Sequence, residues 1–103
     1  MLARDTRQRI PGEDALWRYK RGSARAALGR ADAVEDLRAA TAGDAQAWVA
    51  GRARVELGQL ALKRGDRSAA STEATQAEAL CTTGNDPTCV DDARKLGRNA
   101  RGL

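Results

Sequence analysis

The sequence predicts an all-α protein made of two antiparallel helix-turn-helix units followed by a C-terminal capping helix. Composition is the first reason: the chain is rich in alanine, has no phenylalanine and holds three aromatic residues, Trp17, Tyr19 and Trp48. Alanine is the best helix former, whereas strands favour β-branched and aromatic side chains. Apolar spacings of three and four and regularly placed glycines are the other two reasons. A length of 103 residues indicates one domain with a modest core.

The first unit follows a polar lead-in. Residues 1–12 show no periodicity, so we expect them to be flexible. A helix over residues 13–28 follows, with acidic residues in its first turn, where negative charge is favourable. Gly29 ends this helix, and Asp32 can cap a second one that runs to about residue 42. Residues 13–42 therefore form the first predicted unit.

The second unit shows the clearer periodicity. Asp44 can cap a third helix over residues 45–64, which carries two neighbouring apolar stripes. The turn Gly65-Asp66 ends it, and a fourth helix over residues 68–80 presents alanines on one face. Residues 44–84 form this unit.

The capping helix completes a domain predicted over residues 13–99. A loop is expected over residues 81–89 because it contains Gly84-Asn85-Asp86-Pro87. The helix itself is expected over residues 88–99, with Thr88 and Asp91 forming a variant of the capping box. The tail from Arg98 to Leu103 is expected to fray.

Glycines recur in pairs along the chain. Gly22 and Gly29 are seven residues apart, and Gly58 and Gly65 repeat this spacing 36 residues later. A helix-turn-helix period in the mid-thirties is typical of a helical repeat array. On these residues the chain resembles the tetratricopeptide repeat family.

Residues 51–84 of the second unit carry most of the resemblance. The matching positions are the Leu57-Gly58 pair, the small residue Ala61, the Gly65-Asp66 turn, Ala70 and Ala77 on the second helix, and a late Asp86-Pro87. The first unit matches less well, because Arg21 and Arg25 stand where the family is apolar. Either its first helix is rotated about its axis or the unit is degenerate.

The resemblance implies a protein–protein interaction scaffold. In this family the first helix of each unit lines a concave groove that takes a peptide or a partner helix. An apolar stripe of Trp48, Val55 and Leu62 on the third helix agrees in part with such a groove. This stripe is either open to a ligand or covered by the fourth or fifth helix. The expected groove residues are Leu16, Tyr19, Ser23, Trp48, Arg52, Val55, Gln59, Leu62 and Lys63.

Self-association, or assembly into a larger complex, is the first alternative. Two units are few for such an array, so the end near Trp17 and Leu37 would need a partner. Nucleic-acid binding through Arg4–Arg9, Arg18–Arg25 and Arg94–Arg101 is less favoured, because acidic residues interrupt most of the chain. No run of 18 apolar residues occurs, so we expect no membrane span.

Catalysis is not expected. The chain has no histidine, which removes the commonest general base and the commonest metal ligand. The neighbouring carboxylates Glu35-Asp36 and Asp91-Asp92 would diverge on a helix. The sequence therefore predicts a protein that is not an enzyme and holds no cofactor or metal.

The two cysteines, Cys81 and Cys89, flank the predicted loop. A disulfide between them would stabilise the fold by roughly 2–3 kcal/mol and tie the last helix to the second unit. Two reduced thiols, or a metal or redox role, are the other possibilities. A disulfide favours an extracytoplasmic setting and reduced thiols a cytoplasmic one, although the chain starts without the apolar stretch of a signal peptide.

Overall fold

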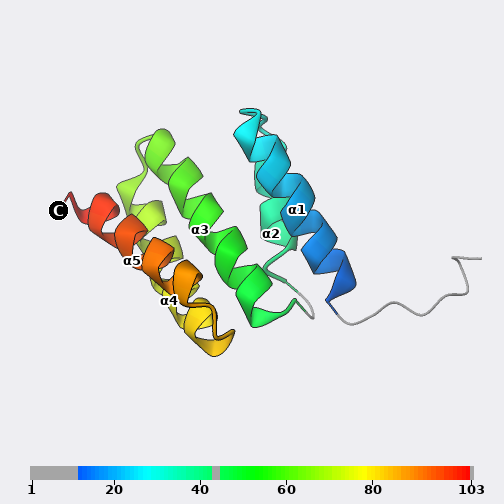
Figure 1. The fold of residues 1–103 in the computed structure, drawn as a ribbon. Helices are drawn as coiled ribbons and strands as arrows, with labels where there is room; N and C mark the ends of the chain where they lie inside the picture. Colours follow the sequence, from blue (N-terminus) through cyan, green and yellow to red (C-terminus); the bar gives the residue numbers. More distant parts are fainter. Residues whose placement is uncertain (1–11, 43–44, 103) are drawn as a thin grey trace, which may run out of the picture.

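The computed structural model describes residues 12–42 and 45–102 and shows an all-α fold, as predicted (Figure 1). This part of the chain contains no strand. Its five helices are α1 (Glu13–Ala27), α2 (Ala33–Ala39), α3 (Ala47–Lys63), α4 (Arg67–Thr83) and α5 (Pro87–Arg101).

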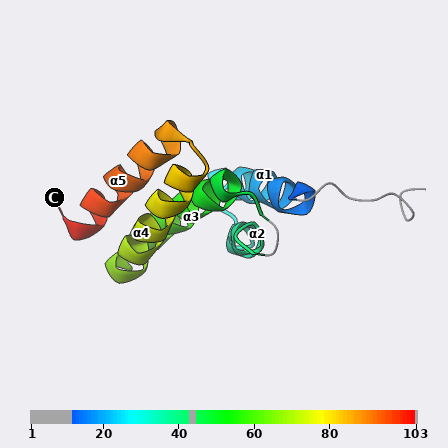
Figure 2. The ribbon, with the colours of Figure 1, turned by 90° about the horizontal axis from the view of Figure 1, so that it is seen from below.

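The helices form two layers. In Figure 1, α1, α3 and α5 run in the same direction, and α2 and α4 run back the other way. Each helix packs on the next one in the chain, and α3 also packs on both α1 and α5. Figure 2 shows α2 and α4 on one side of the row formed by α1, α3 and α5. The opposite side of this row is therefore open to form a groove.

Helix α3 is the centre of the core. It contributes Val49, Ala53 and Leu57 to a cluster shared with α1 and α2. It contributes Val55 to a second cluster, with α4 and α5, and Ala61 to a third. A helix that is apolar on several faces is buried on several faces, and this property places α3 between its neighbours.

Two glycines allow the helices to approach closely. A Cβ atom at Gly22 would lie 2.9 Å from Leu37 Cγ and 3.0 Å from Asp36 Cβ on α2. A Cβ atom at Gly58 would overlap Leu96 Cδ2 on α5. The periodic glycines recognised in the sequence are thus required by packing as well as by turns.

The start of α5 corrects the expected helix boundary. Helix α4 continues to Thr83, and the loop before α5 is shorter than expected. The cap is Asp86, whose carboxylate accepts a hydrogen bond from the Cys89 N–H at 3.3 Å, and Pro87 occupies the first turn. Proline is favoured there because its missing N–H has no helical partner. The proposed box of Thr88 and Asp91 does not cap the helix.

The end of α5 and the start of α2 also differ from expectation. Helix α5 does not fray at Arg98; it continues to Arg101, where Gly102 ends it in the left-handed conformation. Helix α2 is only seven residues long. Asp32 does not cap it through a side-chain hydrogen bond, because the Asp32 carboxylate is bound by Arg30 at 2.8 Å. The expected cap at Asp44 lies outside the described residues, as do residues 1–11 of the lead-in.

Over the residues that the structure describes, no helix is both long enough and apolar enough to cross a membrane.

Candidate functional site

A groove with a mixed polar and apolar lining follows α3 on the side of the helix row away from α2 and α4. One hollow of about 210 Å³ lies between α1, α3 and α5, and a second of about 260 Å³ adjoins it between α1 and α3. Glu56 and Gln59 line both hollows, so we treat the two together as the α3 groove. The first hollow is lined by Tyr19, Arg52, Val55, Glu56, Gln59, Cys89 and Asp92, and the second by Ser23, Ala26, Ala27, Glu56, Gln59, Leu60 and Lys63.

The structure brings six of the nine expected groove residues to this groove. These are Tyr19, Ser23, Arg52, Val55, Gln59 and Lys63. The other three, Leu16, Trp48 and Leu62, line neither hollow and pack against the hydrophobic clusters.

The apolar stripe of Trp48, Val55 and Leu62 is buried only in part. Val55 is only 6% exposed, because residues of α4 and α5 pack over it. Trp48 packs against the cluster between α1, α2 and α3, and Leu62 packs against the cluster at the far end of α3. Trp48 and Leu62 remain partly exposed, and Val55 still lines the first hollow. The groove surface is therefore a mixture of polar and apolar groups.

Glu56 is the half-buried carboxylate of the groove, and no sequence pattern indicated its role. Burial raises the pKa of the Glu56 carboxyl, while hydrogen bonding by Ser23 and Tyr19 opposes the rise. Burial also raises the pKa of Tyr19, and the Glu56 charge adds to this effect. Asp92 on α5 supplies a second, exposed carboxylate to the same hollow.

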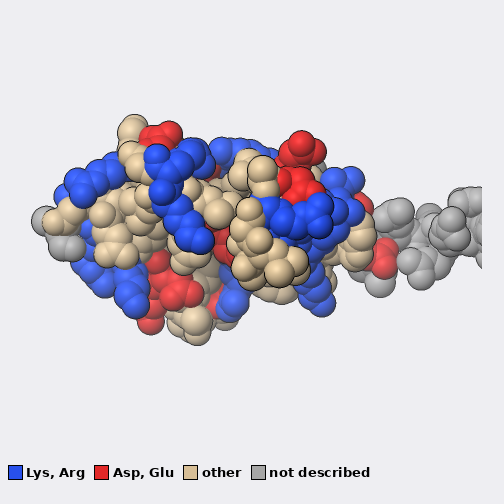
Figure 3. All heavy atoms as spheres, turned by 90° about the horizontal axis from the view of Figure 1, so that it is seen from above, with Lys and Arg blue, Asp and Glu red and all other residues tan. Residues whose placement is uncertain are grey.

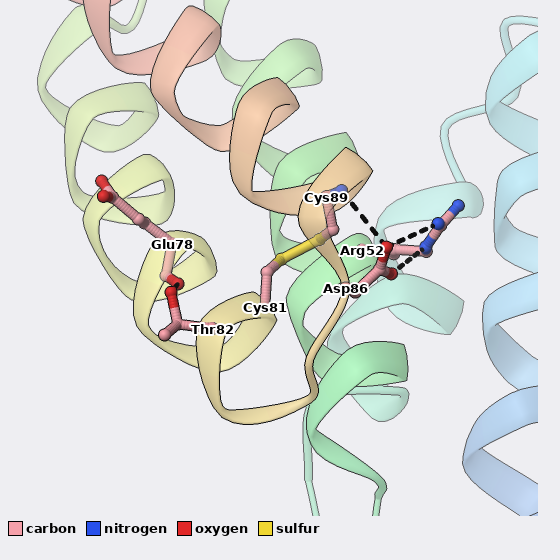
Figure 4. The surroundings of a disulfide bond; sticks show 6 residues. All are labelled: Arg52, Glu78, Cys81, Thr82, Asp86 and Cys89. Atoms are coloured by element: carbon pink, nitrogen blue, oxygen red, sulfur yellow. Dashed lines mark hydrogen bonds and ion pairs between the residues drawn. A yellow bond between two sulfur atoms is a disulfide. The ribbon is translucent and has the colours of Figure 1, made fainter.

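Arg52 is held in place on the groove wall (Figure 4). Its Nε and Nη2 donate to the two carboxylate oxygens of Asp86 at 2.6 and 3.0 Å. These hydrogen bonds hold the pKa of Asp86 below its ordinary value. The same carboxylate caps α5, so the arginine that faces the groove is tied to the start of the last helix.

The expected pairing of Cys81 and Cys89 is confirmed. Their Cα atoms are 5.6 Å apart, within the range that a disulfide requires, and the two sulfurs are joined. Figure 4 shows the bond between the end of α4 and the start of α5, next to Asp86. The disulfide therefore anchors the helix that closes one side of the groove.

A buried carboxylate explains the arginines at apolar positions of the first unit. Asp36 is 1% exposed and accepts hydrogen bonds from Arg21 at 2.6 and 2.8 Å and from Arg25 at 2.8 Å. Hydrogen bonding by Arg21 lowers the pKa of Asp36. Arg21 and Arg25 thus fasten α1 to α2. The spacing of these arginines by one helical turn, before an acidic residue in the next helix, was the available signal.

A second buried carboxylate joins three helices. Glu73 on α4 is 6% exposed and accepts hydrogen bonds from Arg38 of α2 at 2.8 Å and from Arg54 of α3 at 3.0 Å. Ionised partners make such bonds stronger than neutral ones. Nothing in the local sequence separates Glu73 from solvent-facing glutamates, because its partners come from distant segments.

Basic side chains do not form one continuous patch on the face shown in Figure 3. Lys and Arg lie beside Asp and Glu there, with other residues between them. Several arginines are occupied by internal carboxylates, as described for Asp36, Glu73 and Asp86. The segment Arg4–Arg9, which the sequence marks as basic, lies outside the described residues.

The fold and the α3 groove define a small all-α protein with a groove on one face of its α1, α3 and α5 layer. Comparisons of the chain with models of protein families, with curated proteins and with solved structures find no match. The assignment of a function rests on the geometry of this molecule.

Proposed function

We propose that this protein is an interaction scaffold of two tetratricopeptide-like units, α1–α2 and α3–α4, that holds a peptide or helix of a partner protein in the α3 groove. The observation that supports the proposal most directly is which helices form the walls of the groove. The groove is lined by α1, α3 and α5, the three helices that run in the same direction. The proposal includes neither catalysis nor a cofactor.

The charged and polar side chains that line the groove indicate the charge of the ligand. Arg52 is neutralised by Asp86, whereas Glu56 and Asp92 leave carboxylates facing the hollow. Gln59 adds an exposed amide. A segment with lysine or arginine side chains and free backbone amides complements these groups, because interfaces match opposite charges.

The groove is also preorganised. The disulfide of Cys81 and Cys89 and the bidentate pair of Arg52 and Asp86 hold α5 against the rest of the molecule. A rigid site loses less conformational freedom when a ligand binds. This supports capture of a short segment by so small a protein.

Peptide selection tests the proposal. A displayed library of random peptides is selected against the protein, and the selected peptides are measured against two variants. Gln59→Trp places a large ring where both hollows meet. Gln76→Trp makes the same change at an exposed position of α4 outside the groove and serves as the matched control.

We expect selected peptides rich in basic residues, with affinities at least about tenfold weaker for Gln59→Trp and unchanged for Gln76→Trp. Their amide chemical-shift changes should centre on Tyr19, Glu56 and Asp92. Peptides that bind both variants equally, or a library that yields no binder, would argue against the groove as the site.

An assembly role is the second candidate, and one observation favours it. Trp17 on the outer helix α1 and Leu28 at the C-cap of this helix are 53% and 75% exposed, which is unusual for large apolar side chains. Leu37, expected at the same open end, is instead fully buried. Light scattering over a range of concentrations tests this role. A mass that rises with concentration and returns to the monomer in Trp17→Ser with Leu28→Ser would support it.

A further inference from the structure

Three glycines occupy comparable places on the helices of one layer. Gly22 lies on α1, Gly58 on α3 and Gly97 on α5, and the last two sit in the same local pattern, Leu-Gly-x-x-Ala. The first two are each covered by the helix that follows in the chain. Gly97 differs from the other two glycines in the residues that lie over it.

The covering helix brings a carboxylate-bearing residue to each of the first two glycines. Over Gly22 the nearest atoms include Asp36 Cβ of α2, and over Gly58 they include Glu73 Cβ of α4. An arginine of the glycine's own helix binds each carboxylate. Arg21 and Arg25 of α1 bind Asp36, and Arg54 of α3 binds Glu73.

Gly97 is also buried, but no carboxylate-bearing residue of the described chain lies over it. A Cβ atom there would meet only Arg101 Nη1 at 3.3 Å and Ala74 Cβ at 3.6 Å. An open hollow of about 270 Å³ lies beside it between α4 and α5, which we call the α4–α5 hollow. Small residues and arginines make up most of its lining, which consists of Ala74, Thr75, Glu78, Ala93, Arg94, Gly97, Arg98 and Arg101.

Two of the three arginines around Gly97 have no ion-pair partner in the described part of the chain. Arg94 binds Glu78 at 2.9 Å. Arg98 and Arg101 contact no carboxylate in the described part of the chain. A glycine and nearby arginines are therefore present on α5 as on α1 and α3, although the arginines stand at other positions relative to the glycine. No acidic helix of the described chain lies across them.

We propose that the α4–α5 hollow docks a helix from a partner protein, with alanine or glycine on its inner face and an Asp or Glu over Gly97. The absence of a side chain at Gly97 lets another backbone approach closely. Arg98 and Arg101 then bind the incoming carboxylate through charge-assisted hydrogen bonds. The proposal does not depend on the α3 groove, since the two sites share no lining residue.

Helix α4 itself supplies a probe of this chemistry. A labelled synthetic peptide of residues 66–83, with Cys81→Ser to prevent oxidation, is alanine-rich and carries Glu73, which lies over Gly58 in the fold. The same peptide with Glu73→Gln keeps the shape and removes the charge. Fluorescence anisotropy measures the binding of both peptides to the intact oxidised protein.

Three protein variants accompany the peptides. Gly97→Leu places a large side chain beside the hollow, where the atom nearest to the new Cβ is the end of the flexible Arg101 side chain. Arg98→Glu with Arg101→Glu reverses the charge. Gln59→Trp alters only the α3 groove and is the control. Circular dichroism verifies that each variant keeps its helix content.

We expect the peptide with Glu73 to bind, and each change at the hollow to weaken binding by at least about tenfold. The Glu73→Gln peptide should lose as much, and Gln59→Trp should bind like the unchanged protein. No binding at millimolar peptide would overturn the proposal, and so would full binding by Gly97→Leu or by the neutral peptide.

Two further outcomes would also overturn it. Duplex DNA that binds through Arg98 and Arg101 at low salt, with no peptide binding, would show a phosphate site. A protein mass that doubles with concentration and is restored to the monomer by Gly97→Leu would show that the occupant is a second copy.

Discussion

Gly58 is the position where one added methyl group tests the packing of the fold most directly. In Gly58→Ala the new Cβ atom would overlap Leu96 Cδ2 and lie 3.3 Å from Glu73 Cβ. Leu96 is 3% exposed, and Glu73 is fixed by arginines from α2 and α3. Neither neighbour can move without disturbing α4 or α5.

The expected size of the effect follows from two opposing contributions. Overpacking a well-filled core costs about 1–3 kcal/mol, and replacing glycine by alanine within a helix returns about 1 kcal/mol. Gly58→Ala should therefore lower the free energy of unfolding by up to about 2 kcal/mol. At Gly97, where the nearest atom ends a flexible arginine, the same change should raise it by up to about 1 kcal/mol.

Urea unfolding of the oxidised protein, followed by circular dichroism, measures both variants. An unchanged dependence on urea would show that the same surface is exposed in each case. If Gly58→Ala proves as stable as Gly97→Ala, then α5 does not pack on Gly58 as described, and the comparison of the three glycines loses its basis.

Three other predictions concern the ion pairs and the disulfide. Asp36→Ala should lower the free energy of unfolding by about 3 kcal/mol, because Arg21 and Arg25 lose their hydrogen bonds to a buried carboxylate. The control, Asp32→Ala, removes an exposed ion pair and should cost less than about 1 kcal/mol. Equal losses for the two variants in urea unfolding would contradict the burial of Asp36. The fold lowers the pKa of Asp36 and Asp86, so their stabilisation is complete above the unfolded pKa of about 3.9 and is lost as the pH falls through the lower folded values. Urea titrations at decreasing pH should show this loss in the wild type and a smaller one in Asp36→Asn with Asp86→Asn, and an identical pH dependence would count against it. Cys81→Ala with Cys89→Ala should cost roughly 2–3 kcal/mol relative to the oxidised protein, and the denatured wild type should react with no thiol reagent; two reactive thiols would show that the disulfide does not form in solution.

The local sequence was sufficient to predict the helices and the turn between α3 and α4. Gly65 adopts positive φ and Asp66 caps the next helix through the Ala69 N–H, both of which depend on residues close in sequence. The pairing of Cys81 and Cys89 could be predicted for the same reason, since only a short loop separates them. The end of α5 was misjudged because helix ends depend on single caps, and Gly102 was not considered as one.

The sequence by itself determined the helical class of this protein, most helix boundaries to within a few residues, and about half of the residues along the α3 groove. The tertiary structure alone decided that Val55, Asp36 and Glu73 are buried, and that no carboxylate lies over Gly97. The reason is physical: burial of a side chain depends on how helices cross, and the arginine partners of Asp36 and Glu73 lie 11 to 35 residues away along the chain. No local periodicity encodes such a distance.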